Sequence, residues 1–183
     1  MRTCSLHTLL LLGLAAAAGA AACDASPASG KTSAREAPRA AELRSAPVRA
    51  AIDTAARALR TRGYSPSGEE RRGFVVERAS LVDELQMQSG SCYVAIGAAS
   101  VALTGLELAL HDSDGAPVAL DEGGTDARPS LRFCPPHSGT YYLAARSVAG
   151  SGIVALRVFE GPSGLDVRVD DLFGPSEPAG SAP

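Results

Sequence analysis

The sequence contains no tryptophan and no asparagine, and it has a single lysine, Lys31, against sixteen arginines. The preference for arginine and the loss of asparagine are typical of GC-rich coding, since no binding chemistry requires that asparagine be excluded. The absence of tryptophan bears on function, because sugar-binding surfaces usually offer exposed aromatic platforms, and only four phenylalanines and four tyrosines remain. The fractions of hydrophobic residues (45%) and charged residues (20%) are those of a globular protein with one ordinary domain.

Catalytic motifs are also missing. The chain has no Gly-x-Ser-x-Gly elbow, no His-Glu-x-x-His zinc site, no Gly-x-x-x-x-Gly-Lys phosphate loop and no Cys-x-x-Cys pair. Beyond the first 22 residues the only histidines are His111 and His137, and His137 follows two prolines in a predicted loop. We therefore predict a protein that is not an enzyme and that needs no cofactor.

The apolar run at the N-terminus, Leu9–Ala18, is shorter than the roughly 20 residues of a transmembrane helix. Because it follows a positively charged start and precedes small residues, it predicts a cleaved signal peptide over residues 1–22. Residues 14–23, which end in three alanines and Cys23, resemble a bacterial lipoprotein signal, although leucine is more usual at the position of Ala20.

The resemblance implies that Cys23 carries lipid chains, which anchor the protein in a membrane of the bacterial cell envelope. That membrane is the outer or the inner one, with the protein on its periplasmic or surface-exposed side. The alternative is an ordinary secretory signal that is cut after one of the alanines, which would leave Cys23 as a free thiol.

The segment after Cys23 differs in charge from the rest of the chain. Residues 23–45 have almost no large apolar side chains, so we predict a disordered tether. Residues 24–72 carry ten basic and six acidic side chains (+4), whereas residues 73–183 carry six basic and fourteen acidic ones (-8). A basic stem is attracted to anionic lipid headgroups, while an acidic domain is a poor partner for nucleic acid.

One amphipathic helix is predicted over residues 46–62. Val48, Ile52, Ala55 and Leu59 form a single apolar stripe at helical spacing. This stripe has three interpretations, namely docking on a sheet, lying on the membrane, or pairing with a partner helix.

From Gly73 onward the hydrophobic pattern changes to a period of two. The clearest example is the alternation of Leu106, Leu108 and Leu110 with polar or small residues, which is typical of a half-buried strand. Short strands of this kind, separated by Gly, Pro and Asp turns, predict an antiparallel β-sandwich of seven to nine strands over residues 68–161. Residues 162–183 are predicted to be mostly disordered, with one possible short strand near Val167.

Three segments of this region form a recognisable pattern of strand and turn residues. They are residues 90–93 (GSCY), residues 105–115 (GLELALHDSDG) and residues 138–143 (SGTYYL). Together they resemble the bacterial pre-peptidase C-terminal (PPC) domains, which are jelly-roll-like β-sandwiches attached to secreted peptidases, although Glu107 replaces the usual aspartate. The combination with a lipoprotein signal and a preceding helix is similar to uncharacterised envelope lipoproteins of myxobacteria. The resemblance implies a non-catalytic accessory domain, of a kind that in some members binds carbohydrate, matrix protein or calcium.

The two remaining cysteines, Cys92 and Cys134, are predicted to form a disulfide in the oxidising envelope, the alternative being two reduced thiols. Their positions raise one difficulty. Cys92 shares its strand face with Val94, an expected core residue, whereas Cys134 shares its face with Arg132. A bulge or an early strand end is therefore expected near Pro135.

Acidic residues around a predicted hairpin are candidates for calcium binding, namely Asp112, Asp114 and Asp121 beside His111. The alternative is an ordinary turn, for which Asp and Gly are equally suited. Tyr141 and Tyr142 must point to opposite faces of their strand, so one of them can be exposed.

The function expected from these patterns is non-catalytic binding of an envelope protein or polysaccharide. The alternatives are calcium-dependent or enzymatic activity at the 111–114 hairpin, or a purely structural spacer.

Overall fold

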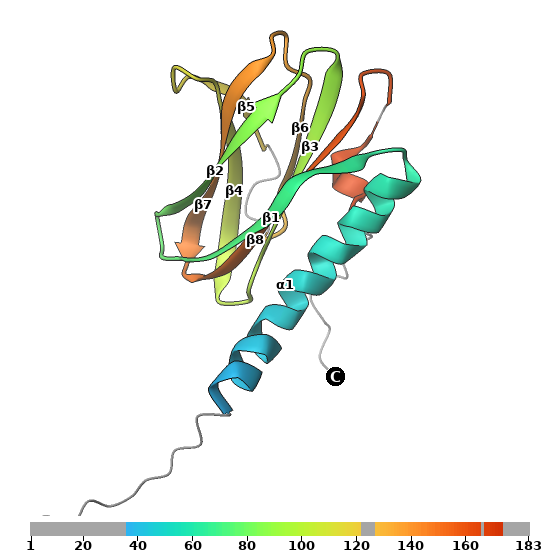
Figure 1. The fold of residues 1–183 in the computed structure, drawn as a ribbon. Coiled ribbons are helices and arrows are strands. Elements are labelled where there is room, and N and C mark those ends of the chain that lie inside the picture. Colours follow the sequence, from blue (N-terminus) through green and yellow to red (C-terminus); the bar gives the residue numbers. More distant parts are fainter. Residues whose placement is uncertain (1–35, 122–126, 166, 174–183) are drawn as a thin grey trace, which may run out of the picture. The chain divides into compact units, whose positions relative to one another are not determined.

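The computed structural model describes residues 36–121, 127–165 and 167–173, which form a β-sandwich with one long helix on its outside (Figure 1). The first sheet has the strand order β1-β8-β3-β6 and the second β2-β7-β4-β5, and every neighbouring pair is antiparallel. This order is that of an eight-stranded jelly roll, so the predicted jelly-roll-like sandwich of seven to nine strands is confirmed. The strands are β1 Ser65–Val75, β2 Ser80–Met87, β3 Ser91–Ala99, β4 Leu103–His111, β5 Pro117–Leu120, β6 Ser130–Phe133, β7 Gly139–Gly150 and β8 Gly152–Pro162.

The space between the two sheets is filled by the side chains that alternate along the strands. On β4, Leu106, Leu108 and Leu110 point inward as predicted and are fully buried. At the C-terminal end of β1 the inward residue is Val75. Its neighbours Phe74 and Val76, which the sequence pattern places together on one strand face, are largely exposed.

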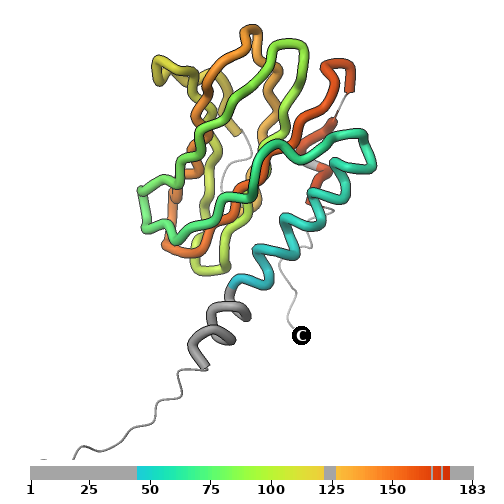
Figure 2. The backbone as a smooth tube through the Cα atoms, in the orientation of Figure 1, coloured from blue at the N-terminus to red at the C-terminus, as the bar shows by residue number. Residues whose placement is uncertain are grey.

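Helix α1, Glu36–Thr61, lies across the outer face of the first sheet, which we call the helix-side sheet (Figure 2). The whole predicted stripe is buried against this sheet, so docking is the correct one of the three interpretations. The helix and sheet residues form a second apolar cluster with Val48, Ile52, Ala55, Leu59, Val94, Ile96 and Phe159 among its members. No helix among the described residues is both long and apolar enough to cross a bilayer.

The helix begins ten residues earlier than predicted. Residues 36–45 consist mostly of Ala, Arg, Glu and Leu, which are among the best helix formers, and Pro38 lies in the first turn, where proline is tolerated. The lack of large apolar residues therefore did not prevent order here, because the segment extends a helix already fixed by the docked stripe. The predicted signal peptide, Cys23 and the rest of the tether lie outside the described residues.

The segment after β8 also differs from the prediction of a mostly disordered tail. Val167 and Leu172 are buried beside α1, and residues Val169–Asp171 form a short 3-10 helix rather than the possible strand. The Arg132 guanidinium donates to the Leu165 carbonyl at 2.9 Å, and the Ser130 hydroxyl donates to the Val169 carbonyl at 3.2 Å. These bonds hold Leu165 and residues 167–173 at the edge of the helix-side sheet, whereas residues 166 and 174–183 lie outside the described part of the chain.

The predicted disulfide between Cys92 and Cys134 is present, with 4.1 Å between the two Cα atoms. In the antiparallel β3–β6 register, Val94 pairs with Arg132 and Tyr93 with Phe133. Continued by one residue, the same register places Cys92 opposite Cys134. Val94 faces the helix rather than the space between the sheets. Both cysteines therefore share the outer, helix-side face. Of the two expected irregularities near Pro135, the early strand end is present, since β6 ends at Phe133, and the bulge is not needed.

We expect replacement of both cysteines, Cys92→Ala with Cys134→Ser, to lower the free energy of unfolding by about 4 kcal/mol. The bridge joins residues 42 positions apart, and its loss gives back the loop entropy of the unfolded chain. Urea unfolding measures the change. Reductant should destabilise the wild type by a similar amount and leave the double variant unaffected; equal stability of the two proteins would contradict a structural role for the bridge.

Candidate binding face on the open sheet

The second sheet, β2-β7-β4-β5, has no helix on its outer face among the described residues, and we call it the open sheet. The sheet register places Val82, Ala144, Ala109 and Leu120 in one row across β2, β7, β4 and β5. The two alanines in the middle are flanked by larger side chains, of which Val82 is 49% and Leu120 62% exposed. Small residues between larger ones leave a hollow of about 410 Å³ on this face.

Polar side chains border the hollow in the neighbouring rows. Glu107 lies opposite Arg146 on one side, and His111 lies opposite Tyr142 on the other. The expected division of the tyrosine pair is therefore present, with Tyr142 on the open face and Tyr141 buried between the sheets. The face thus combines apolar, aromatic and charged groups of both signs, which is a composition suited to binding another molecule.

The β4–β5 hairpin, which holds the calcium candidates, is built as a turn. The Asp112 carboxylate accepts hydrogen bonds from the backbone N–H groups of Asp114 (3.0 Å) and Ala116 (2.8 Å). The His111 ring lies 3.2 Å from the Gly115 carbonyl through Nδ1. Within the described residues no three His, Cys, Asp or Glu side chains come together as a metal site. Asp121 lies at the end of β5 on the rim of the hollow, and the acidic residues at 122 and 126 lie outside the described chain.

His137 lines a different hollow, of about 490 Å³, between the hairpin and the start of β7, which also includes Asp112 and Ser138. The Ser138 hydroxyl accepts a hydrogen bond from the Ser89 backbone N–H, and the Asp112 carboxylate is occupied by the turn. In the described part of the chain no hydrogen bond joins the His137 ring to a serine or a carboxylate. The geometry therefore provides no activated nucleophile at this place.

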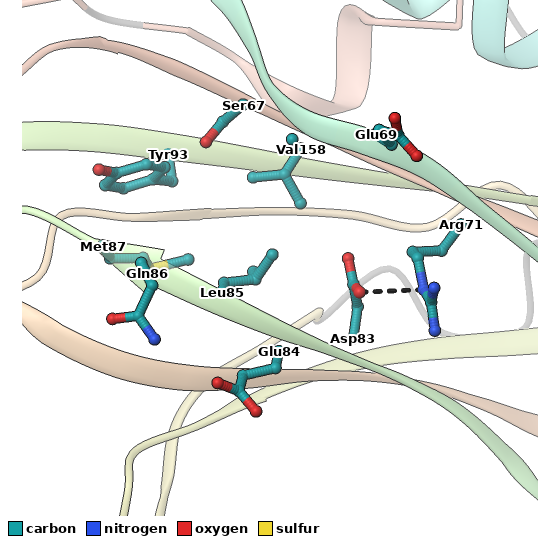
Figure 3. Close-up of a pocket in the computed structure, with 11 residues that line it drawn as sticks. Ser67, Glu69, Arg71, Asp83, Glu84, Leu85, Gln86, Met87, Tyr93 and Val158 are labelled. Atoms are coloured by element: carbon teal, nitrogen blue, oxygen red, sulfur yellow. Dashed lines mark ion pairs between the residues drawn. The ribbon is translucent and has the colours of Figure 1, made fainter.

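A third hollow, of about 340 Å³, lies at the seam between the edge strands β1 and β2 (Figure 3). Strand β1 carries two more residues than β8 between Ser67 and Arg71, with Gly68 at φ +74°, so its chain bulges away there. The floor is apolar and includes Leu85 and Val158, whereas the rim is charged.

An ion pair crosses this seam from one sheet to the other. The Arg71 Nε lies 3.0 Å from the Asp83 carboxylate, which occupies an inward position of β2 between Leu81 and Leu85 (Figure 3). Burial raises the pKa of Asp83 above its ordinary value of 3.8, and the positive charge of Arg71 offsets this only in part. Nearby, burial also raises the pKa of Tyr93, whose hydroxyl accepts a hydrogen bond from the Gln88 backbone N–H. This seam is therefore a structural contact between the two sheets.

Neither a protein-family model nor a curated protein sequence matches this chain. Among solved structures it is similar to PliG from Aeromonas hydrophila, a periplasmic lysozyme inhibitor of g-type lysozyme, with a TM-score of 0.42 and 11% identity over 52% of this chain and 88% of that one. It is also similar to the pre-peptidase C-terminal domain of collagenase from Bacillus anthracis, with a TM-score of 0.41 and 18% identity over 50% and 89% of the two chains.

Because the folded pKa of Asp83 is raised, its protonated form is favoured in the native state, and this contribution is lost as the pH rises through the folded pKa. We therefore expect the wild type to lose stability relative to Asp83→Asn as the pH rises from below 3.8 towards neutrality. Urea unfolding at a series of pH values measures the difference. In an Arg71→Gln background the loss should extend to higher pH, since the compensating charge is gone. A difference that grows in favour of the wild type with rising pH would show that the ion pair outweighs desolvation.

Proposed function

We propose that this chain is a non-catalytic, lipid-anchored protein of the bacterial cell envelope whose sandwich binds a partner protein or a surface polymer through the open sheet. The observation that carries the proposal is the difference between the two outer faces of the sandwich. The helix-side sheet is covered by α1, Leu165 and residues 167–173, whereas the open sheet presents Val82 and Leu120 beside a hollow with charged borders. A hollow that is lined by both apolar and charged side chains is a typical place for binding.

The non-catalytic part of the proposal is supported by the surroundings of the polar residues. Asp112 stabilises a turn, and Asp83 pairs with Arg71 across the seam. Both carboxylates thus have structural partners. Two of the polar groups on the open face, Glu107 and Arg146, lie opposite each other in neighbouring strands and suit hydrogen bonds or ion pairs with a bound molecule.

The lipid anchor is supported by the sequence of residues 1–23, which resembles a lipoprotein signal ending in Cys23. The two other cysteines of the exported chain are joined to each other, so Cys23 has no disulfide partner within it. An acylated Cys23 removes the difficulty of a single free thiol in an oxidising compartment.

We expect Cys23→Ser to move the protein from the membrane fraction to the soluble fraction of the envelope. Several acyl chains hold a protein firmly, since each buried methylene contributes about 0.8 kcal/mol. Fractionation and the mass of the mature N-terminus measure the change, and the Cys92→Ala, Cys134→Ser double variant should stay membrane-bound. An unmodified Cys23 in the wild-type protein would refute the anchor.

For the open face, we expect Val82→Glu with Leu120→Glu to abolish the capture of envelope components by the purified protein, because two charges would have to be desolvated in the contact. Ala50→Glu, on the exposed side of α1, is the matched control and should leave capture unchanged. Capture from detergent-solubilised envelopes, compared by mass spectrometry, gives the readout. If both variants capture the same components as the wild type, the binding site is not on the open sheet.

A further inference from the structure

Three tight turns converge at one end of the sandwich, the end at the bottom of Figures 1 and 2. They are the β1–β2 turn at residues 76–79, the β3–β4 turn at residues 100–102 and the β7–β8 turn at Ser151. Together with the strand ends that carry them, residues 74–79, 100–103 and 147–153, they form what we call the turn end. The β4–β5 hairpin and the His137 loop lie at the opposite end of the strands.

Hydrogen bonds join the three turns to one another. The Ser151 hydroxyl accepts from the Glu77 backbone N–H at 2.9 Å, which links the first turn to the third. The Ser100 hydroxyl accepts from the Ile153 N–H at 3.1 Å, and the Ser100 N–H donates to the Ile153 carbonyl at 2.9 Å, which links the second turn to the third. The turns therefore form one continuous surface.

The same turns are packed so closely that only glycine fits at two positions. A Cβ atom on Gly150, whose φ is +82°, would lie 2.2 Å from the Ala102 carbonyl oxygen, and one on Gly152 would lie 2.3 Å from the Ser100 hydroxyl. Close packing and mutual hydrogen bonds make the turn end a rigid platform, so the side chains on it are held in place.

This platform is apolar on its outside. Val101 is 86%, Phe74 69% and Val76 55% exposed; these are three of the seven large hydrophobic side chains that are exposed among the described residues. The charged residues of the turn end are Glu77 and Arg78, which lie 4.0 Å apart as an ion pair, so its net charge is zero. Val76 and Val101 lie in two different turns, and Phe74 lies next to the first of them; protruding apolar side chains of this kind suit the soft interface of a bilayer.

The direction of α1 brings the start of the described chain towards this end. At the C-terminal end of α1, Tyr64 packs on Gly161 near the end of β8, which is the end of the sandwich remote from the turns. From there α1 runs back across the sheet, and its N-terminal half approaches the turn end (Figure 1). Between Glu36, where α1 begins, and Cys23 lie only the twelve residues 24–35.

We propose that the turn end contacts the surface of the lipid bilayer, with Phe74, Val76 and Val101 in the interfacial layer. The proposal rests on the lipid anchor at Cys23 put forward above, because the anchor confines the sandwich to the membrane and makes a shallow apolar contact sufficient. In this orientation the strands run roughly along the bilayer normal. The open sheet then faces parallel to the membrane plane, and the β4–β5 hairpin lies at the end remote from the membrane.

The chain has no tryptophan, and in a chain of residues 23–183 produced without acylation Cys23 is the one cysteine besides the bonded pair Cys92 and Cys134, so both a tether and a probe can be placed at single sites. Residues 23–183 are coupled through Cys23 to a maleimide-bearing lipid in vesicles of phosphatidylcholine and phosphatidylglycerol. Single variants Phe74→Trp and Val101→Trp place the probe on the turn end, and Leu120→Trp, on the open sheet, is the matched control. Emission wavelength and quenching by spin-labelled lipids are then measured.

We expect Trp emission at positions 74 and 101 to move to shorter wavelength and to be quenched on the order of twofold, as for a group that enters the headgroup boundary. The Leu120→Trp control should keep its solvent-exposed emission. The triple variant Phe74→Ser, Val76→Ser, Val101→Ser is also made in the untethered Cys23→Ser background. In vesicle flotation, several-fold less of this variant than of the Cys23→Ser parent should float with the vesicles.

Solvent-exposed emission at all positions would overturn the proposal, and so would equal quenching at position 120, which would mean unspecific adsorption. A blue shift at position 74 that appears without lipid and grows with protein concentration would identify the turn end as an interface between copies of this chain. Because the tether is chemical, these outcomes do not depend on acylation in the cell. They are thus distinguishable from a failure of the anchor itself, which the mass of the mature N-terminus reports.

Discussion

The packing of α1 on the helix-side sheet is the contact on which the rest of the structure depends. Without it, Val94, Ile96 and Phe159 would be exposed on the outer face of β3 and β8, and each such side chain contributes roughly 1.5–3 kcal/mol when buried. The helix also makes β3 a strand with two buried faces, which explains its unbroken run of buried residues from Cys92 to Ala98. The sandwich and its helix are therefore one folding unit, in which the middle layer is the helix-side sheet.

This contact also distinguishes the two outer faces of the sandwich. One face is covered by α1, Leu165 and residues 167–173, whereas the strands of the open sheet show the alternation of a half-solvated sheet. The hollow on it results from two alanines, Ala109 and Ala144, that meet across β4 and β7.

The sequence predicts those features that depend on local pattern. The stripe of α1 and the alternation on β4 are periodic, so the helix, the sandwich and its core follow from them. Pairings between distant strands do not follow, because register depends on the whole fold. For this reason the hollow between Ala109 and Ala144 and the ion pair of Arg71 with Asp83 were not expected. The difficulty with Cys134 had the same origin, since the pattern alone does not distinguish a side chain that faces a helix from one that faces the other sheet. Phe74 shares a face with Val76 in the sequence pattern, but the pattern does not show that this face of β1 is the outer one, because only the position of the second sheet makes Val75 the inward residue.

The two edge strands at the seam, β1 and β2, show how the sandwich ends on that side. An edge strand has unpaired backbone groups that invite another strand, and an inward-pointing charge on such a strand discourages this pairing. Asp83 on β2 and Arg71 on β1 are inward charges of opposite sign, and they neutralise each other across the seam. An apolar strand that paired with this edge would have to desolvate both charges. The raised pKa of Asp83 is the cost of that arrangement, since its carboxylate is already partly withdrawn from water. Association through this edge is thereby disfavoured.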